Sequence, residues 1–398
     1  MKKLWIITLA LCCFLSCRSD DDGQPEPEPD PVIYEGDAYL PTREAIVEFM
    51  ARGYTFIDGD LRIGQPVTDS EDDPINDLSV FAPITEVTGS LFITNTDVTD
   101  LSDFENLSKV GLDFIINSNE QLSSLAGLET LTEVGNGIAI WHNPLLESLE
   151  PLRNLQGYDG IFYLAGINRL KNLKGLEGMS SDPHSILLSG PHLESLEGLP
   201  QINSLRGNLV VSGCTSLPNL EMFRGIKTIG GNLYLFAVPL IDDLSVFDDL
   251  TEVGSILAVL ATGVSEVSTF NQITELDSIL INDNDNLTAI TGFQNLSKAK
   301  AVIVRDQPIL VDLPGFSGLD TITEQIEITR NLSLADLNDL SNVQAAPKYI
   351  GIYRNDNLTD YCGLTNLTNN LSNNDEYYII DNAFNPSSQD ILAGNCRQ

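Results

Sequence analysis

The feature that most constrains this chain is a repeat of about 22 to 24 residues that runs through most of its 398 residues. Each unit begins with a short apolar alternation, as in "SLFIT" and "NLYLF", and continues after a turn with an apolar residue at about every third position. One unit cannot bury its apolar side alone, whereas stacked units bury a continuous core. The repeat therefore predicts a solenoid. A long α-helix is excluded because its apolar period would be 3.6 residues, without Gly and Asn at the turns.

The apolar alternations also give the first inward residue of each predicted strand. Counted in this way, the chain is expected to be a mainly β, single-domain solenoid of about 14 coils, over residues 61–359 with caps at both ends. The predicted inward positions are Leu61, Leu91, Phe114, Ile138, Phe162, Ile186, Leu209, Leu233, Leu257, Ile279, Val302, Ile326, Ile350 and Tyr378.

The unit resembles leucine-rich repeats, and more closely the receptor L domain and its relatives among surface lipoproteins of Bacteroidota-type bacteria. An apolar residue stands four positions before the strand residue, as in Val87 to Leu91, where the ordinary leucine-rich unit has three. The resemblance implies a parallel, L-domain-like solenoid in which a row of Asn or Cys side chains ties successive loops together. At this position the sequence has Asn119, Asn143, Cys214, Asn284, Asn331 and Asn355. Cys214 is therefore interpreted as a buried structural thiol rather than a nucleophile.

The N-terminal residues read as an export signal followed by a tether. In residues 1–16 two lysines precede an apolar run that is too short to span a bilayer, as in a secretory signal peptide. The following "FLSC" resembles a bacterial lipobox, which implies lipidation of Cys17; an ordinary signal peptide is the alternative. Residues 17–36 are rich in Pro and carboxylates and predict an extended tether. We expect a surface-exposed outer-membrane lipoprotein that contacts the membrane through its lipid alone.

Both ends of a solenoid expose apolar faces and need covers. Residues 37–60 predict an N-terminal cap helix and lead-in, with Thr42 as the N-cap and Gly53 as the stop. The inward stripe of this helix is Ala45, Ile46, Phe49 and Met50. Residues 360–398 predict a C-terminal cap. Export to an oxidising compartment favours a disulfide between Cys362 and Cys396, with two free thiols as the alternative.

Charge and motif content argue against several function classes. With 57 Asp plus Glu against 21 Lys plus Arg, the formal net charge is −36, which repels nucleic-acid phosphates. The three histidines do not stand in a metal-ligand spacing, and neither a nucleophile elbow nor a phosphate-binding loop occurs. We expect no cofactor, no metal and no catalysis. A β-solenoid enzyme acting on polysaccharides is the less favoured alternative, because it would need basic residues that are scarce here.

The outward side chains of the predicted strands are mostly apolar. If Leu233 and Leu235 face the core, the alternate residues face outward, and aromatic residues recur at these positions. They are Phe92, Trp141, Tyr163, Tyr234 and Phe236. An apolar surface of this extent is typical of a contact surface, and aromatic side chains suit both protein hot spots and sugar stacking. In the alternative interpretation they stabilise neighbouring strands through cross-strand pairs.

These features predict a lipid-anchored recognition or adhesion protein at the cell surface. It would bind a protein partner through the outward strand face. A glycan-binding lipoprotein of a nutrient-uptake system is the alternative, and a structural role in the envelope is a further one. The chain has two Trp, one of them in the signal peptide, and this scarcity favours a protein partner over a sugar.

Overall fold

The computed structural model describes residues 30–65, 74–345, 347–372 and 375–398. The chain divides into two units, residues 1–31 and residues 32–398, and the fold below is that of the second unit. The predictions for the signal peptide, for Cys17 and for most of the tether lie outside the described residues.

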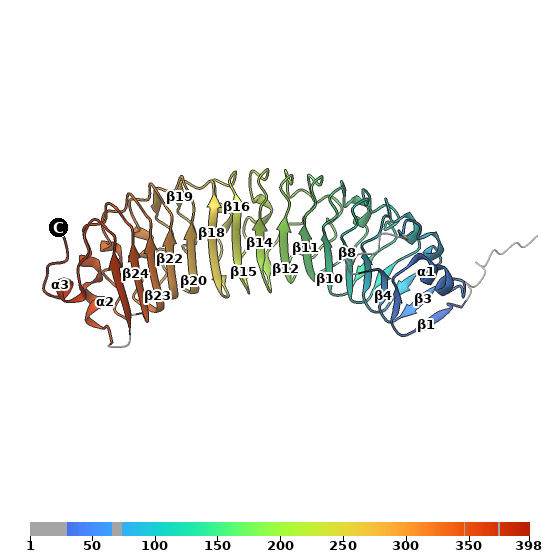
Figure 1. Ribbon diagram of the computed structural model, residues 1–398, viewed down its shortest axis with the longest axis horizontal. Helices are drawn as coiled ribbons and strands as arrows, with labels where there is room; N and C mark the ends of the chain where they lie inside the picture. The colour runs from blue at the N-terminus through green and yellow to red at the C-terminus, as the bar shows by residue number, and fades with distance from the viewer. Residues whose placement is uncertain (1–29, 66–73, 346, 373–374) are drawn as a thin grey trace, which may run out of the picture. The chain divides into compact units, whose positions relative to one another are not determined.

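The main sheet contains 15 parallel strands within the described residues, and they stack side by side in chain order (Figure 1). They are β2 (Ala38–Leu40), β4 (Leu61–Gly64), β6 (Leu91–Thr94), β8 (Asp113–Asn117), β10 (Gly137–Trp141), β11 (Ile161–Ala165), β12 (Ser185–Ser189), β14 (Leu209–Ser212), β16 (Leu233–Val238), β18 (Ile256–Thr262), β20 (Glu275–Asn282), β22 (Lys298–Arg305), β23 (Thr321–Thr329), β24 (Tyr349–Tyr353) and β25 (Glu376–Ile380).

Short strands form three smaller parallel sheets on other sides of the coils. The first contains β1 (Ile33–Glu35), β3 (Phe56–Asp58), β5 (Glu86–Val87), β7 (Lys109–Val110) and β9 (Glu133–Val134). The second contains β13 (Ser204–Leu205), β15 (Thr228–Ile229) and β17 (Glu252–Val253), and the third β19 (Glu266–Val267) and β21 (Ala289–Ile290). The predicted mainly β architecture with long parallel sheets is confirmed.

Helical segments are short and mostly close the coils on the side away from the main sheet. The 3-10 turns are η1 (Ser79–Phe81), η2 (Ser102–Phe104), η3 (Glu150–Leu152), η4 (Glu221–Phe223), η5 (Ser245–Phe247), η6 (Pro314–Phe316), η7 (Asn338–Leu340) and η8 (Cys362–Leu364). The α-helices are α1 (Arg43–Met50), α2 (Thr365–Asn369) and α3 (Ser388–Leu392). Across the described residues, each helix is too short or too polar to cross a bilayer.

The corner between a short strand and the next long strand explains the four-residue spacing in the sequence. A Cβ atom on Gly111 would lie 2.1 Å from the Thr88 carbonyl oxygen, and one on Gly135 would lie 2.0 Å from that of Gly111. Successive corners therefore touch through their backbones, which only glycine permits at this distance. The extra residue of the repeat forms this corner.

The core consists of the inward strand residues and of aromatic rings stacked from coil to coil. The rings of Phe247, Phe270, Phe293 and Phe316 follow one another with centroid distances of 5.8, 5.3 and 5.8 Å, and all four side chains are fully buried. Each buried Phe contributes about 1.5–3 kcal/mol relative to an exposed one. The stack thus joins neighbouring coils by dispersion contacts as well as by strand pairing.

A buried row of polar side chains joins the loops that follow the main strands. The Asn331 amide donates to the Val304 carbonyl at 3.0 Å, and its Oδ1 accepts from the Gln307 backbone N–H at 3.2 Å. The same two contacts recur at Asn119, Asn284 and Asn355. Asn143 makes them with Ile116 and Asn119.

The row has other members that were not predicted. They are Thr96, Thr262, Gln307 and Asn382, which bond to the neighbouring Asn side chains. Apolar side chains take the equivalent positions at Ile167 and Val238, and Cys214 lies between them, so the polar row has two segments. The family resemblance indicates only Asn or Cys at this position of the repeat, so it did not identify Thr96, Thr262 or Gln307 as members of the row.

Two corrections apply to the predicted N-terminal end of the repeat. The sequence predicts a tether up to residue 36, but Ile33–Glu35 forms β1 and pairs in register with β3. It also predicts the first strand at Leu61, but Ala38–Leu40 pairs with β4, so the segment interpreted as a cap also contains a sheet strand. The signal is present as "GDAYL", which matches "GDLRI" at the next corner, but the small Ala38 obscures it.

The predicted register of the last strand is wrong by one residue. The structure pairs Ile350 with Tyr377, not with Tyr378, so Tyr377 packs against the core and Tyr378 points outward. Since side chains alternate, this slip exchanges the two faces of the strand, and Ile379 is buried rather than outward. Two tyrosines followed by two isoleucines, "YYII", make the alternation ambiguous.

Replacement of a buried ladder residue tests how strongly the loops are joined. Asn331→Ala should lower the free energy of unfolding by about 2–4 kcal/mol, because it leaves two buried backbone groups without partners. Asn342→Ala is a matched control, since that amide donates to the Ser317 carbonyl at 2.7 Å in an exposed position where water replaces it. Urea unfolding followed by circular dichroism measures both, and equal losses would contradict the expectation.

Candidate functional site

The five predicted aromatic residues all lie on the outward face of the main sheet. Phe92, Trp141, Tyr163 and Tyr234 are half-buried there, and Phe236 is 48% exposed. They do not form one cluster, because they are distributed over β6, β10, β11 and β16. The prediction that aromatic side chains point away from the core therefore agrees with the geometry, but the structure offers an extended surface rather than a compact site.

Two of the aromatic residues form a pair across neighbouring strands. Trp141 ends β10 and Tyr163 lies in the middle of β11, and their ring centroids are 5.9 Å apart with planes inclined at 43°. Trp141 is in register with Ala165, whose small side chain leaves room for the large ring. The pair presents a continuous aromatic surface across two coils.

Phe92 has a different environment from the other four. The guanidinium carbon of Arg62, its neighbour on β4, lies 3.8 Å from the Phe92 ring centroid. This cation–π contact occupies one face of the ring. Phe92 is therefore partly used within the protein and is the weakest of the predicted contact residues.

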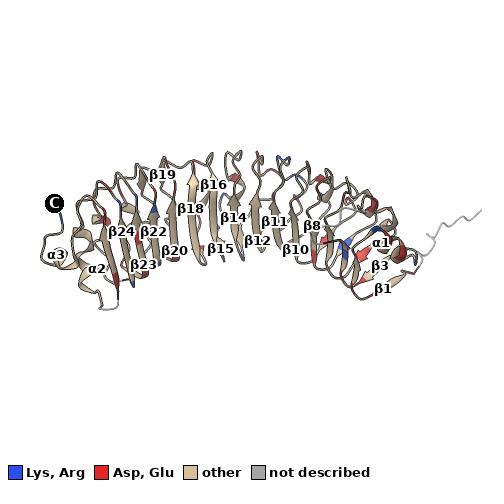
Figure 2. Ribbon diagram, in the orientation of Figure 1, with Lys and Arg blue, Asp and Glu red and all other residues tan. Residues whose placement is uncertain are grey.

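Six consecutive strands of the main sheet carry no charged residue. Their sequences are GIAIW, IFYLA, SILLS, LVVS, LYLFAV and ILAVLAT, from β10, β11, β12, β14, β16 and β18. Figure 2 shows these strands as tan ribbons, while coloured residues lie on the loops and toward the ends. In a chain of net charge −36, such a block requires an explanation.

We call the outward side chains of these strands the uncharged face. They include Ala139, Trp141, Ile161, Tyr163, Ala165, Leu187, Ser189, Val210, Ser212, Tyr234, Phe236, Ala258 and Leu260. Ala258 is fully buried although it points outward, since it lies in register between Tyr234 and Leu280. The side chains of the face therefore also pack on one another, as expected from cross-strand pairing.

The outward surface changes character after β22. Glu327 of β23 accepts hydrogen bonds from Arg305 and from the Gln325 amide, the latter at 2.9 Å. On β24 the hydroxyl groups of Tyr349 and Tyr353 lie 2.6 Å apart. Burial, followed by this hydrogen bond and the nearby Glu327 carboxylate, raises the pKa of Tyr353. None of these residues was predicted to belong to a site.

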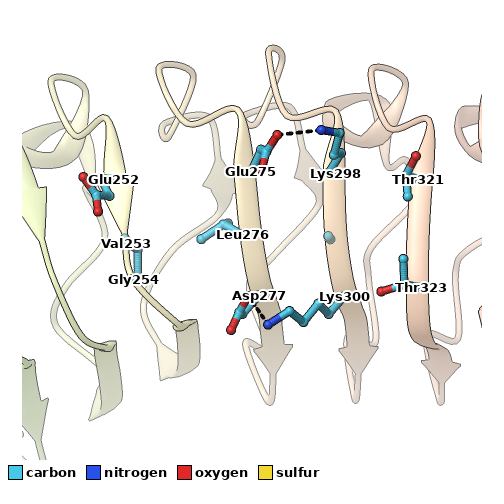
Figure 3. Close-up of a pocket in the computed structure, with 11 residues that line it drawn as sticks. Glu252, Val253, Gly254, Glu275, Leu276, Asp277, Lys298, Lys300, Thr321 and Thr323 are labelled. Atoms are coloured by element: carbon cyan, nitrogen blue, oxygen red, sulfur yellow. Dashed lines mark hydrogen bonds and ion pairs between the residues drawn. The ribbon is translucent and has the colours of Figure 1, made fainter.

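A groove of about 380 Å³ lies along the first residues of β20, β22 and β23 (Figure 3). The corner position is Gly254 in one coil, but Asp277, Lys300 and Thr323 occupy it in the next three coils. In these three coils the short strand before the corner and the long strand after it form one continuous strand. The two lysines in the groove are paired, Lys298 with Glu275 at 2.8 Å and Lys300 with Asp277 at 2.7 Å. Both lysines of the groove are therefore held in ion pairs with carboxylates of the preceding strand.

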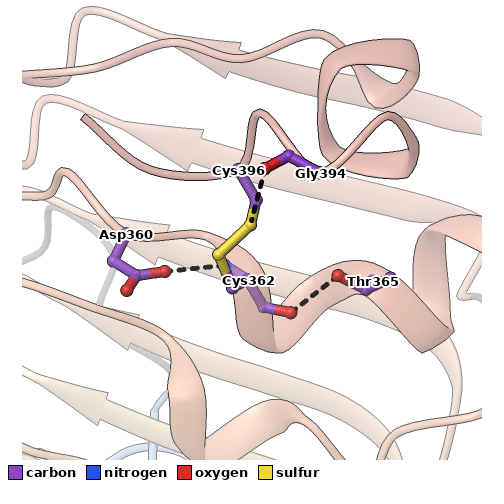
Figure 4. Close-up of a disulfide and its surroundings, with 5 residues drawn as sticks. All are labelled: Asp360, Cys362, Thr365, Gly394 and Cys396. Atoms are coloured by element: carbon purple, nitrogen blue, oxygen red, sulfur yellow. Dashed lines mark hydrogen bonds between the residues drawn. A yellow bond between two sulfur atoms is a disulfide. The ribbon is translucent and has the colours of Figure 1, made fainter.

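The two cysteines of the C-terminal segment form a disulfide, as the sequence favoured (Figure 4). The Cys362 backbone N–H donates to Asp360 at 2.9 Å, and the Tyr361 N–H donates to the Cys396 carbonyl at 2.8 Å. The chain end is thereby held against the last coils. Asp360 and the two cysteines are close enough to suggest metal ligands, but sulfur atoms joined to each other are not thiolate ligands.

Cys214 is the free cysteine of the described residues and is fully buried. Burial raises the pKa of its thiol, which lies 3.6 Å from the Ser212 carbonyl oxygen. A buried thiol of raised pKa is a poor nucleophile. The geometry thus suits the structural role that the resemblance implied.

The histidines do not assemble with other catalytic groups in the described part of the chain. His184 Nδ1 lies 3.0 Å from Ser185 Oγ, but that oxygen also accepts from the Asn208 backbone N–H and is buried beside the strand. His142 is exposed at a corner with a φ of 54°. His184 and His142 thus stand at the start and the end of main-sheet strands, where the repeat accounts for their positions.

Comparison with known proteins supports the receptor L-domain resemblance over part of the chain. The family model of the receptor L domain matches residues 55–122, a segment that contains β3, β4, β6 and β8. A search of curated proteins finds no match.

Loss of the disulfide should loosen the C-terminal coils. Cys362→Ala/Cys396→Ala should lower their stability by about 3–4 kcal/mol, since the bridge closes a loop with a sequence separation of 34. Hydrogen exchange measured by mass spectrometry should show lost protection in residues 358–398 and unchanged protection near β10. Wild-type protein treated with a reductant should behave in the same way, and full protection in either sample would contradict the expectation.

Proposed function

We propose that this chain is a non-catalytic recognition or adhesion protein, anchored by a lipid at the cell surface, which binds a protein partner through the uncharged face. The observation that carries the proposal is the run of six strands without a charged residue in a chain of net charge −36. A solvated outer face of a sheet normally carries polar side chains. Charge depletion with aromatic enrichment is typical of the centre of a protein interface.

The size of the uncharged face is consistent with an interface core. Six strands at a spacing of about 4.8 Å extend over about 24 Å, and five residues of strand cover about 13 Å. The resulting area, roughly 300 Å², is less than the roughly 800 Å² that each partner buries in a standard interface. Neighbouring loops and strands would supply the polar rim. Trp141 with Tyr163, and Tyr234 with Phe236, would be the two anchors.

A protein partner explains this face better than a glycan does. Hydroxyl groups of a sugar need several donors and acceptors, whereas the face offers few polar atoms beyond those of Ser189, Ser212, Tyr163, Tyr234 and Trp141. An apolar protein surface needs none of these. The acidic surroundings would repel acidic proteins and favour a partner with basic residues around an apolar centre.

The first test compares the wild-type chain with Trp141→Ala/Tyr163→Ala/Tyr234→Ala/Phe236→Ala. A partner isolated by cross-linking from cell-surface extracts would be purified and titrated directly. Its Kd should rise at least about 30-fold in the variant, because truncated hot-spot residues cost more than about 1 kcal/mol each.

The matched control truncates exposed apolar side chains outside the uncharged face, in Leu112→Ala/Ile309→Ala/Leu332→Ala. Its Kd should stay within about twofold of wild type. Circular dichroism would check the fold of both variants. Equal binding by a folded face variant would place the contact elsewhere.

The lipid anchor is tested separately at Cys17. Expressed in a bacterium that processes lipoproteins, the full chain should incorporate an alkyne fatty acid, and Cys17→Ser should abolish the label and release the protein from membranes. Cys13→Ser is the control, because this cysteine lies within the predicted signal peptide and should not affect labelling. A label that persists in Cys17→Ser would refute the anchor.

A further inference from the structure

The outward surface of the C-terminal coils contains a group of three tyrosines that we call the tyrosine platform, Tyr349, Tyr353 and Tyr378. Tyr349 and Tyr353 lie on β24, on either side of Gly351, and Tyr378 is in register with Gly351 on β25. The ring centroids of Tyr349 and Tyr378 are 6.1 Å apart. The platform is separated from the uncharged face by the strands β20, β22 and β23.

Gly351 makes room for the side chains of Tyr349 and Tyr353. A Cβ atom at this position would lie 2.6 Å from the Tyr349 hydroxyl oxygen and 2.6 Å from a ring carbon of Tyr353. The two tyrosines are four residues apart, or about 13 Å of strand, and their hydroxyl groups meet over the glycine. Both side chains therefore extend along the strand over Gly351, and the planes of the Tyr349 and Tyr378 rings are inclined at 48°.

Polar side chains border the platform on the next strands. Glu327 is in register with Gly351, and its side chain is only 13% exposed. It is fixed by Arg305, by the Gln325 amide and by the Thr329 hydroxyl, which donates at 3.3 Å. The charges of Arg305 and Glu327 offset each other, whereas the exposed Glu376 of β25 lies in register with Tyr349 on the other side of the platform.

Two buried polar atoms in this border have no hydrogen-bond partner in the described residues. They are Nε of Arg305 and Oδ1 of Asn282, and these residues are in register on β22 and β20. One is a donor and the other an acceptor. A buried polar atom without a partner is costly, so a small side-chain movement that let a ligand supply an acceptor and a donor would be favoured here.

We propose that the tyrosine platform and its border bind an uncharged saccharide. A sugar ring has an apolar C–H face that packs on an aromatic ring, and hydroxyl groups at its edge that donate and accept. The platform supplies the first contact, and Glu327, Gln325, Arg305 and Asn282 supply partners for the second. The net charge of −36 disfavours an acidic saccharide, and the charge of Glu327 is offset by its ion pair with Arg305.

This proposal goes beyond the recognition function and does not depend on it. The uncharged face lacks charged border groups, whereas the platform combines aromatic faces with fixed polar groups. Binding of the protein partner and binding of the saccharide should therefore respond to different substitutions.

The test titrates the full chain, in detergent, with uncharged gluco-, manno- and galacto-oligosaccharides, with galacturonate oligomers and with an aromatic-rich peptide. At least one uncharged oligosaccharide should bind with a Kd near or below about 1 mM. In Tyr353→Ala/Tyr378→Ala its affinity should fall at least about tenfold. Tyr377→Phe is the matched control: its side chain packs against the core, its hydroxyl has no partner among the described residues, and binding should be unchanged.

A second measurement does not require a variant to fold. The bound saccharide should slow nitration of Tyr378, which is 44% exposed, in the wild-type chain. The variant of the uncharged face should keep this protection, which separates failure of this proposal from failure of the proposed function. Absence of binding by every uncharged oligosaccharide, a preference for galacturonate or for the peptide, or unchanged affinity in a folded Tyr353→Ala/Tyr378→Ala would each overturn the proposal.

Discussion

Everything in this fold depends on the requirement that successive coils lie within backbone hydrogen-bonding distance, about 4.8 Å apart. Parallel pairing imposes this spacing on the main sheet, and the other parts of the coil must follow it. Glycines such as Gly111 and Gly135 allow the corners to touch, and the buried Asn row joins the loops. The phenylalanine stack has centroid distances of 5.3 to 5.8 Å, so one ring from each coil contacts the ring of the next.

The same constraint explains what could be predicted from the sequence. Inward residues such as Leu233 recur at nearly constant intervals, so strand positions and the Asn row followed from periodicity and resemblance. The predicted strand positions were wrong at the first and last coils, because each of these coils has a repeat on only one side with which its sequence can be aligned. Ala38 was too small to mark a strand, and in "YYII" alternation alone did not distinguish Tyr377 from Tyr378.

The candidate sites could be predicted only in part, for a related reason. Outward aromatic residues such as Trp141 and Tyr234 follow from alternation once the inward set is known. The tyrosine platform instead depends on a glycine between two tyrosines and on the correct register of the next strand. The unpartnered atoms of Arg305 and Asn282 depend on side-chain packing across strands, which has no signature in a single repeat.

The coil-by-coil construction also has a consequence for how the two surfaces are positioned. Each coil contacts mainly its neighbours, so a whole coil gained by duplication between β18 and β20 would leave both surfaces and the polar border of the platform intact. The distance between the uncharged face and the tyrosine platform would change by one strand spacing for each such event. Relatives of this chain with different numbers of coils would therefore hold two bound ligands at separations that differ by whole multiples of the strand spacing.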